Sequence, residues 1–236
     1  MMGQDSVETQ AAGLLDTLRS EAQRFSGAEP RSESEMLETI VRSAVNTVPG
    51  AEQAGISLLH ADGSVTSQAV SHASITDVDR LQAQYREGPC VTALWDEHTV
   101  SVPDMTDAAS RWPQFAPQAA AAGVGSMLSF QLYARDASLG ALNLYGSQPG
   151  NFDADADTLG GLFAVHAAAA LGEARHICQL HQAISTRDVI GQAKGMLMER
   201  FGVDAEQAFQ MLVTSSQETN LKLVAVAQWL TGQAQQ

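Results

Sequence analysis

Hydrophobic residues recur at helical spacing near the start of the chain. Within residues 4–25, and again within residues 36–45, apolar side chains fall three and four positions apart, the spacing of one face of an α-helix. A polar stretch at residues 26–34 separates the two segments, and Pro49-Gly50 ends the second. The pattern therefore predicts two amphipathic helices in this part of the chain.

An extended pattern follows and predicts a sheet. Residues 54–59 and 65–70 flank Asp62-Gly63, a dipeptide typical of a hairpin turn. Helices are expected over residues 77–85 and 111–122. This mixture of elements predicts an α+β fold with an antiparallel sheet of five or six strands flanked by helices. The remaining expected strands lie at residues 99–102, 127–134 and 139–145.

From residue 158 the helical pattern continues almost without a break to Phe201. A helix of this length cannot be buried by one domain, so part of it is expected to pair with another chain as a coiled coil. Gly202 is placed to end it, and Asp204 is expected to cap a second helix. Asn220 is expected to cap a third helix. Three helices with one apolar stripe each predict a small bundle.

The acidic balance of the chain restricts its partners. The 236 residues carry 27 acidic and 13 basic side chains, for a net charge of −14. The whole excess lies in residues 1–174, because residues 175–236 carry equal numbers of acidic and basic side chains. An acidic surface repels phosphate backbones, so we expect any nucleic acid contact within residues 175–236.

Other features of the composition point to a cytoplasmic protein. No apolar run is long enough to span a bilayer, and the first residues resemble neither a secretion signal nor a myristoylation site. Cys90 and Cys178 lie far apart, outside any CxxC motif, and are expected to be reduced thiols. We therefore expect no membrane contact and no metal site.

The only two lysines of the chain, Lys194 and Lys222, lie in this neutral region. Arg187 and Lys194 are seven positions apart, so on a helix they project to nearly the same side. Gly191 and Gly195 lie beside them, although a glycine inside a helix costs about 1 kcal/mol relative to alanine. Either a phosphate or base approaches the helix there, or neighbouring helices pack tightly. Both explanations stay open at Gly191, and packing is preferred at Gly195.

Lys222 is expected in the first turn of the third helix, where free backbone amides favour an anion. Asn220 as the cap and Ser215-Ser216 just upstream would complete a phosphate-binding corner. The alternative is a solvated lysine beside an ordinary helix cap. The residues of this corner do not decide between the two.

Five short motifs in the middle of the chain resemble the GAF family as it occurs in actinobacterial regulators. The resemblance covers roughly residues 35–172 and implies a domain that binds a small molecule or acts as a dimerising sensor. It does not fix which ligand is bound, if any, so the ligand-binding residues stay unknown. The motifs are Glu87-Gly88-Pro89-Cys90, Val102-Pro103-Asp104-Met105, Arg111-Trp112-Pro113, Gly123-Val124-Gly125-Ser126-Met127-Leu128-Ser129 and Leu139-Gly140-Ala141-Leu142-Asn143-Leu144-Tyr145.

Residues 177–231 resemble the ANTAR family through all three expected helices. That family is a three-helix RNA-binding module that recognises paired stem-loops in nascent transcripts and favours antitermination. The resemblance rests on Ile184-Ser185-Thr186-Arg187-Asp188-Val189-Ile190-Gly191-Gln192-Ala193-Lys194-Gly195-Met196-Leu197-Met198, Ala208-Phe209, Leu212, Ser215-Ser216, Asn220, Lys222-Leu223 and Val226-Ala227. By resemblance, the RNA surface comprises Arg187, Lys194, Gly195, Ser215, Ser216, Asn220 and Lys222, whereas Ala193 serves packing or close approach.

The two resemblances together predict a homodimeric antitermination regulator. It would have an N-terminal helical segment (1–34), a GAF-like sensory domain (35–172) and an RNA-binding domain (173–236). Its partner would be a pair of stem-loops in leader RNA, and it would affect RNA polymerase only indirectly. No phosphoacceptor receiver domain is found, so control would come from the GAF-like part or be absent.

Four other functions are alternatives to this prediction. An enzyme could use Cys90 as a nucleophile, but no spacing identifies a base, so no catalytic residue is predicted. A sensor kinase could use His166 or His176, but no ATP-binding lobe follows. A DNA-binding helix-turn-helix is the most serious alternative, but its recognition helix, expected over residues 221–230, has Lys222 as its only charge and no row of Arg, Asn or Gln side chains to read base edges. A ligand-sensing dimer that acts through a protein partner leaves the placement of the lysines unexplained.

Overall fold

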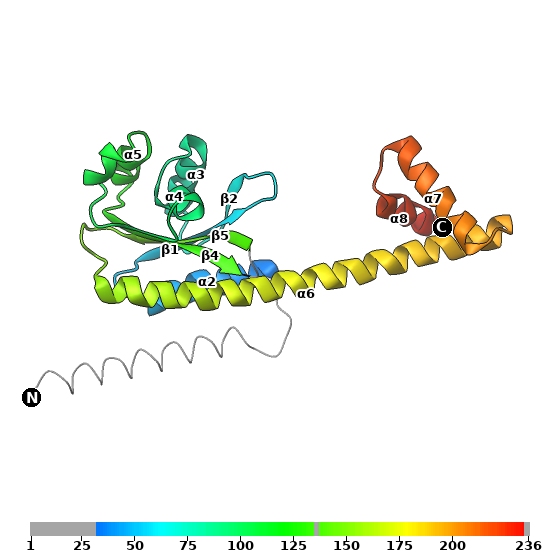
Figure 1. Ribbon diagram of the computed structural model, residues 1–236, viewed down its shortest axis with the longest axis horizontal. Helices are drawn as coiled ribbons and strands as arrows, with labels where there is room; N and C mark the ends of the chain where they lie inside the picture. The colour runs from blue at the N-terminus through cyan, green and yellow to red at the C-terminus, as the bar shows by residue number, and fades with distance from the viewer. Residues whose placement is uncertain (1–31, 135–136, 234–236) are drawn as a thin grey trace, which may run out of the picture. The chain divides into compact units, whose positions relative to one another are not determined.

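The computed structural model describes residues 32–134 and 137–233 (Figure 1). The helix predicted over residues 4–25 lies outside the described residues. The chain divides between Arg175 and His176 into two compact units. The long helix α6 (Ala154–Phe201) contributes its first part to one unit and its last part to the other.

In the described residues, the first unit is built on a five-stranded antiparallel sheet with the spatial order β2-β1-β5-β4-β3. All the predicted strands are present, and the predicted α+β class is confirmed. The Asp62-Gly63 turn joins β1 to β2, with Leu59 paired to Val65. The strands are β1 (Gln53–Leu59), β2 (Val65–Val70), β3 (Thr99–Val102), β4 (Ser126–Ala134) and β5 (Ala137–Gly146).

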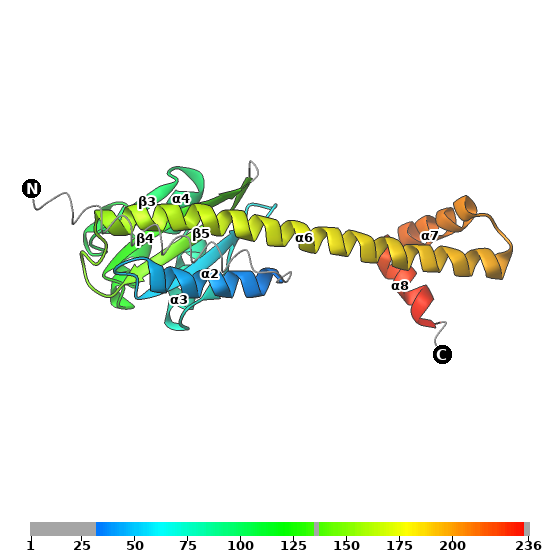
Figure 2. The same ribbon diagram turned by 90° about the horizontal axis from the view of Figure 1, so that it is seen from below.

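Helices cover both faces of this sheet (Figure 1). On one face lie α3 (Ser74–Tyr85), α4 (Pro89–Trp95) and α5 (Phe115–Ala121). On the other face α2 (Glu33–Thr47) runs beside the first part of α6, as Figure 2 shows. The Arg175 guanidinium of α6 donates to the Glu33 carboxylate of α2 over 2.6 Å, which joins the two helices.

Two helical features of this unit differ from the sequence prediction. The helix expected over residues 111–122 is shorter, because a 3-10 turn (Asp107–Ser110) precedes it and α5 begins only at Phe115. Pro113 lacks an amide hydrogen and restricts the residue before it, which separates the two elements. Helix α4 was not predicted, because seven residues are too few to show a helical period.

Each face of the sheet buries its own hydrophobic core. Ile40, Leu142 and Phe163 belong to the core between the sheet and the α2–α6 pair, and each is completely buried. Trp112 and Phe115 belong to the core on the opposite face. Because the sheet is covered on both sides, β1, β4 and β5 are buried over most of their length instead of alternating between buried and exposed positions.

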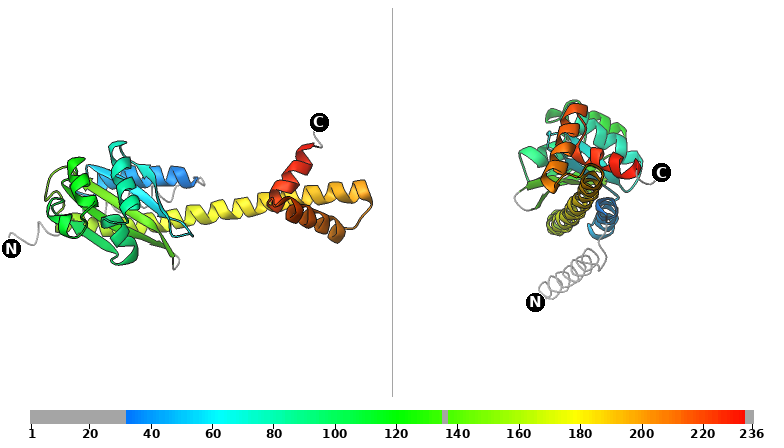
Figure 3. Two further views of the ribbon diagram at one scale, coloured as in Figure 1. Left: turned by 90° about the horizontal axis from the view of Figure 1, so that it is seen from above. Right: turned by 90° about the vertical axis from the view of Figure 1, so that its right-hand side faces the viewer.

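The second unit is a bundle of the last part of α6 with α7 (Ala205–Thr219) and α8 (Leu223–Gln233), seen in Figure 3. Gly202 ends α6 at a positive φ of 66°, as predicted. The Asp204 carboxylate accepts a hydrogen bond from the Gln207 amide (2.8 Å), so the predicted cap of α7 is confirmed. The buried side chains shared by the three helices are Ala193, Leu197, Ala208, Leu212, Val226 and Ala227.

The helix-capping role predicted for Asn220 is wrong. Asn220 does not cap α8 but ends α7, in the left-handed conformation (φ 53°) that asparagine tolerates better than most residues. Lys222 lies immediately before α8 rather than inside its first turn, and its carbonyl accepts hydrogen bonds from the amides of Ala225 and Val226.

Candidate functional site

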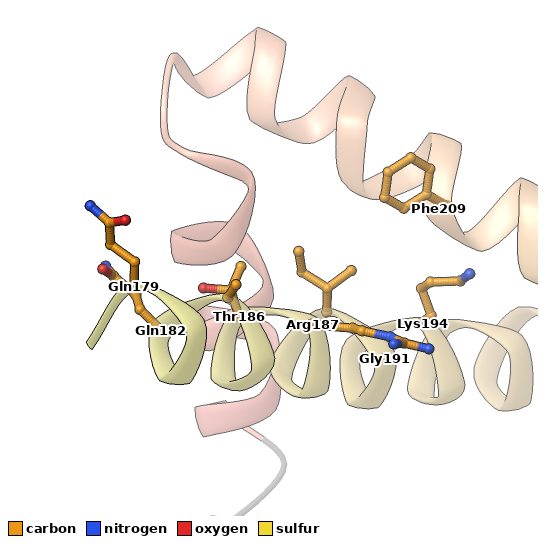
Figure 4. Close-up of a pocket in the computed structure, with 9 residues that line it drawn as sticks. Gln179, Gln182, Thr186, Arg187, Gly191, Lys194 and Phe209 are labelled. Atoms are coloured by element: carbon orange, nitrogen blue, oxygen red, sulfur yellow. The ribbon is translucent and has the colours of Figure 1, made fainter. Parts of the chain in front are cut away.

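A shallow groove of about 710 Å³ follows the last part of α6 in the second unit (Figure 4). Side chains of α6 line most of its length, and Phe209 of α7 contributes the opposite wall. The groove is open to solvent along one side. Its lining residues are Gln179, Gln182, Ala183, Thr186, Arg187, Ile190, Gly191, Lys194 and Phe209.

The groove brings together two of the predicted cations. Arg187 is exposed and Lys194 half-buried, and the Lys194 Nζ lies 5.7 Å from the centroid of the Phe209 ring. A cation at this distance from an aromatic face is attracted by the ring. Within the described part of the chain neither Arg187 nor Lys194 forms an ion pair. Their positive charge therefore remains available to an anionic partner.

Gly191 and Gly195 are exposed on α6, and Gly191 belongs to the groove lining. Among the described residues, a Cβ atom added at either position would meet no atom of another part of the chain within 4 Å. Tight helix packing therefore does not account for them, and the explanation preferred for Gly195 is wrong. The fully buried Ala193, by contrast, serves packing in the bundle core.

The remaining predicted RNA contacts do not line the groove. Asn220 and Lys222 are exposed at the connection between α7 and α8. The Ser216 hydroxyl donates to the Leu221 carbonyl over 2.6 Å and so closes this connection. Ser215 is half-buried, and its carbonyl accepts a hydrogen bond from Thr219 (2.6 Å). The structure therefore divides the predicted surface into a groove and a separate corner.

Sequence reasoning missed several groove residues. The spacing of Phe209 with Ala208 and Leu212 fits the apolar stripe of its helix, yet Phe209 is only half-buried and faces Lys194. Gln179, Gln182 and Thr186 carried no signal except their spacing of three and four positions, which places them on one side of α6. Trp229 is 63% exposed on α8.

A second candidate site is a buried polar cluster beneath α3 in the first unit. The Asp79 carboxylate is 4% exposed and accepts hydrogen bonds from Ser67 Oγ (2.9 Å), Asn143 Nδ2 (3.1 Å) and the Tyr145 hydroxyl. Burial raises the pKa of Asp79 above its ordinary value, although the three donors oppose the shift. Burial and the neighbouring carboxylate also raise the pKa of Tyr145. Beside them the buried Gln82 uses its carbonyl to accept from the Cys90 amide (2.8 Å).

Because its native pKa is raised, Asp79 binds its proton more tightly in the folded than in the unfolded chain. Its contribution to stability is therefore largest below the ordinary pKa of 3.8 and is lost as pH rises through the native pKa. The side chain of the Asp79→Asn variant cannot titrate, so the variant lacks this pH-dependent contribution. The free energy of unfolding of the variant minus that of wild type should therefore rise as pH increases from 3.8 to the native pKa of Asp79. Urea unfolding at a series of pH values measures the difference.

Asp77→Asn serves as the matched control, because Asp77 lies on the same helix but is exposed and pairs with Arg80 at 2.9 Å. For this control, the difference in unfolding free energy between variant and wild type should not rise with pH in the same way. If the stability difference between Asp79→Asn and wild type also did not change with pH, the raised pKa of the buried Asp79 carboxyl would be contradicted.

Cys90 lies next to this cluster and is 1% exposed. Burial raises the pKa of its thiol to about 12, so almost no thiolate exists at neutral pH. Cys178 is half-exposed on α6. In the native protein we expect iodoacetamide to alkylate Cys178 at least about a hundred times faster than Cys90, as followed by peptide mass spectrometry.

In denaturant both thiols should react at similar rates, which controls for the intrinsic chemistry of the two sites. Rapid alkylation of Cys90 in the folded protein would contradict its burial. Within the described residues, no three His, Cys, Asp or Glu side chains are grouped so that they could hold a metal ion. None of the described helices is long and apolar enough to cross a membrane.

Two family models match the chain. The model of the GAF domain matches residues 30–172, and the model of the ANTAR domain matches residues 178–230. The first match includes the sheet with its covering helices and the Asp79 cluster. The second match includes the groove and the three helices of the bundle. No curated protein matches the chain at a significant level.

Solved structures share the fold of the first unit at low sequence identity. The GAF domain from an Acinetobacter phosphoenolpyruvate-protein phosphotransferase is 17% identical, with a TM-score of 0.55, over 69% of this chain and 95% of that chain. Free methionine-R-sulfoxide reductase from Neisseria meningitidis, solved with its substrate, is 16% identical, with a TM-score of 0.55, over 71% of this chain and 93% of that chain. The Stigmatella aurantiaca phytochrome photosensory core module is 13% identical, with a TM-score of 0.58, over 88% of this chain and 46% of that chain.

Proposed function

The chain belongs to the GAF domain family and carries an ANTAR domain, and on this basis we propose that it is an RNA-binding regulator of transcription antitermination. A GAF domain joined to an ANTAR domain indicates a sensor and regulatory protein rather than an enzyme. In our proposal residues 35–172 sense or dimerise, residues 173–236 bind RNA, and the protein works in the cytoplasm.

The observation that carries the proposal is the groove in which Arg187 and Lys194 lie without an acidic partner among residues 32–134 and 137–233. In a protein with a net charge of −14, such a site is the part that phosphate can approach. The open space at Gly191 and Gly195 allows a ligand to come close to the helix beside Lys194. A few cationic contacts suffice when a folded RNA is also recognised by its shape.

The second part of the proposed RNA surface is the corner between α7 and α8. Lys222 is exposed there, beside the exposed Asn220. Ser216 fixes the backbone of this corner through its bond to Leu221, and Ser215 lies one residue earlier. In the proposal Lys222 contacts a phosphate, and the serines and Asn220 maintain or extend that contact.

The proposed target is a pair of stem-loops in a leader transcript, bound by a homodimer. Two linked modules raise the local concentration of the second site, so modest affinity for each stem-loop becomes firm binding of the pair. Binding would stabilise one RNA fold against a competing terminator, and RNA polymerase would be affected only through the transcript. The GAF domain would supply the dimer contact or the response to a small molecule.

Binding of the full-length protein to a two-hairpin leader RNA, measured by gel shift at fixed salt, tests the proposal. Duplex DNA of equal charge is the control, because an electrostatic surface without RNA specificity would bind both. The expected result is a shift with the RNA alone, and increased read-through when the same leader precedes a terminator in a transcription assay.

Equal and salt-sensitive binding to RNA and DNA would overturn the proposal, and so would the absence of binding to either. In both cases the remaining explanation would be a ligand-sensing dimer that acts through a protein partner.

A further inference from the structure

We propose that the groove on α6 binds one unpaired nucleotide, with its base against Phe209 and its phosphate near Arg187 and Lys194. This inference rests on the proposed RNA-binding function and assigns a ligand to one part of that surface. It adds a base-binding site that involves Phe209 and Ile190, neither of which carried a predicted role in RNA binding.

The shape of the groove fits a nucleotide. Its volume of about 710 Å³ lies within the range of small-molecule sites. The side chain of Ile190 and the ring of Phe209 provide apolar walls, and Gly191 has no side chain to obstruct the space between them. A base is flat and largely apolar on its faces, so it gains from contact with such walls.

Phe209 is placed to contact a base rather than to hold the bundle together. Its ring is half-buried, and it is not among the described residues that form or pack against the buried core of the bundle. Lys194 lies at the same ring, so a stacked base would have a cation within reach of its phosphate. Aromatic rings that carry a neighbouring cation are typical sites for single-stranded nucleic acid.

Polar side chains at the other end of the groove can contact a neighbouring nucleotide of the same loop. Gln179, Gln182 and Thr186 follow one another at helical spacing along α6 and line the groove (Figure 4). Amide and hydroxyl groups both donate and accept hydrogen bonds, as an exposed base edge requires. Stacking on Phe209 selects an unpaired nucleotide, because paired bases in an RNA duplex expose neither face.

A double-mutant cycle between protein and RNA tests the inference. The RNA probe is a hairpin with a fixed stem, selected for binding to the wild-type protein from a pool with a randomised loop. Each loop nucleotide is replaced in turn by an abasic residue, and affinities are measured for wild type and for Phe209→Ala. At one loop position the abasic change should weaken binding of wild type by about tenfold to a hundredfold, yet have little further effect on Phe209→Ala.

Phe201→Ala is the matched control, because Phe201 is a 56% exposed phenylalanine of the same helix bundle that does not line the groove. It should bind like wild type, and its abasic series should match the wild-type series. The inference is overturned if Phe209→Ala binds like wild type, or if no loop position is coupled to Phe209. If no hairpin of the pool binds wild type, the proposed function itself fails and the base site with it.

A second variant separates loss of the site from loss of the fold. In Gly191→Leu the new side chain has open space and replaces a helix-destabilising glycine, so thermal stability should be kept or raised. The same side chain narrows the groove, so affinity for the selected hairpin should fall at least about tenfold. Undiminished affinity in a stable Gly191→Leu protein would overturn the placement of the nucleotide.

Discussion

Replacing both Arg187 and Lys194 by alanine is expected to reduce affinity for hairpin RNA by at least about a hundredfold at physiological salt. A hydrogen bond to a charged group contributes about 1.5–3 kcal/mol, and two such contacts are lost together. Neither side chain supports the fold through an ion pair within the described residues. The bundle should therefore stay folded, and circular dichroism should show unchanged helix content.

Salt dependence gives this prediction a second readout. Each lost phosphate contact should lower the slope of log affinity against log salt by about 0.7–0.9, so the double variant should lose about twice that. The charge-matched control is the double change Arg42→Ala and Arg200→Ala, which removes two exposed arginines outside the groove. If both double variants lost affinity equally, the effect would come from net charge and not from the groove.

Gly160→Ala is expected to destabilise the first unit by about 1–3 kcal/mol, whereas Gly161→Ala should be neutral or stabilising by up to about 1 kcal/mol. A Cβ atom at Gly160 would lie 2.5 Å from the Phe130 ring, and that ring is 2% exposed in the core between α6 and the sheet. A Cβ atom at Gly161 would meet the same ring at 3.9 Å, an ordinary contact.

The two variants differ from wild type by one methyl group on adjacent residues of one helix, so each controls for the other. Urea unfolding and thermal melting of the full-length protein should place wild type between them or level with Gly161→Ala. Equal stability of the two variants would contradict the close contact between Gly160 of α6 and the Phe130 ring.

The sequence predicted the elements of both units well, because their signals are local. Strand alternation, the capping pair of Asp204 and Gln207 and the terminating Gly202 each depend on neighbours within a few residues. The seven residues of α4 escaped prediction, because so short a helix shows no period. Asn220 was misassigned because its preference for turns suits the end of one helix as well as the start of the next.

The candidate sites needed more than local signals. The sequence indicated Arg187 and Lys194 because scarce cations at a spacing of seven share one side of any helix. It could not show that Phe209 faces Lys194, because that contact depends on how α7 packs against α6. In the same way Trp229 matched an apolar pattern but faces solvent.

By itself the sequence determined the order and type of the elements, the separation of an acidic region from a neutral one, and the two families that the chain resembles. The tertiary structure alone decided which side chains meet across elements, such as Asp79 with Tyr145 from a distant strand. It also decided that Gly191 and Gly195 adjoin open space. The physical reason is that periodicity and capping act within one helix or strand, whereas a groove or buried cluster exists only after separate segments pack together.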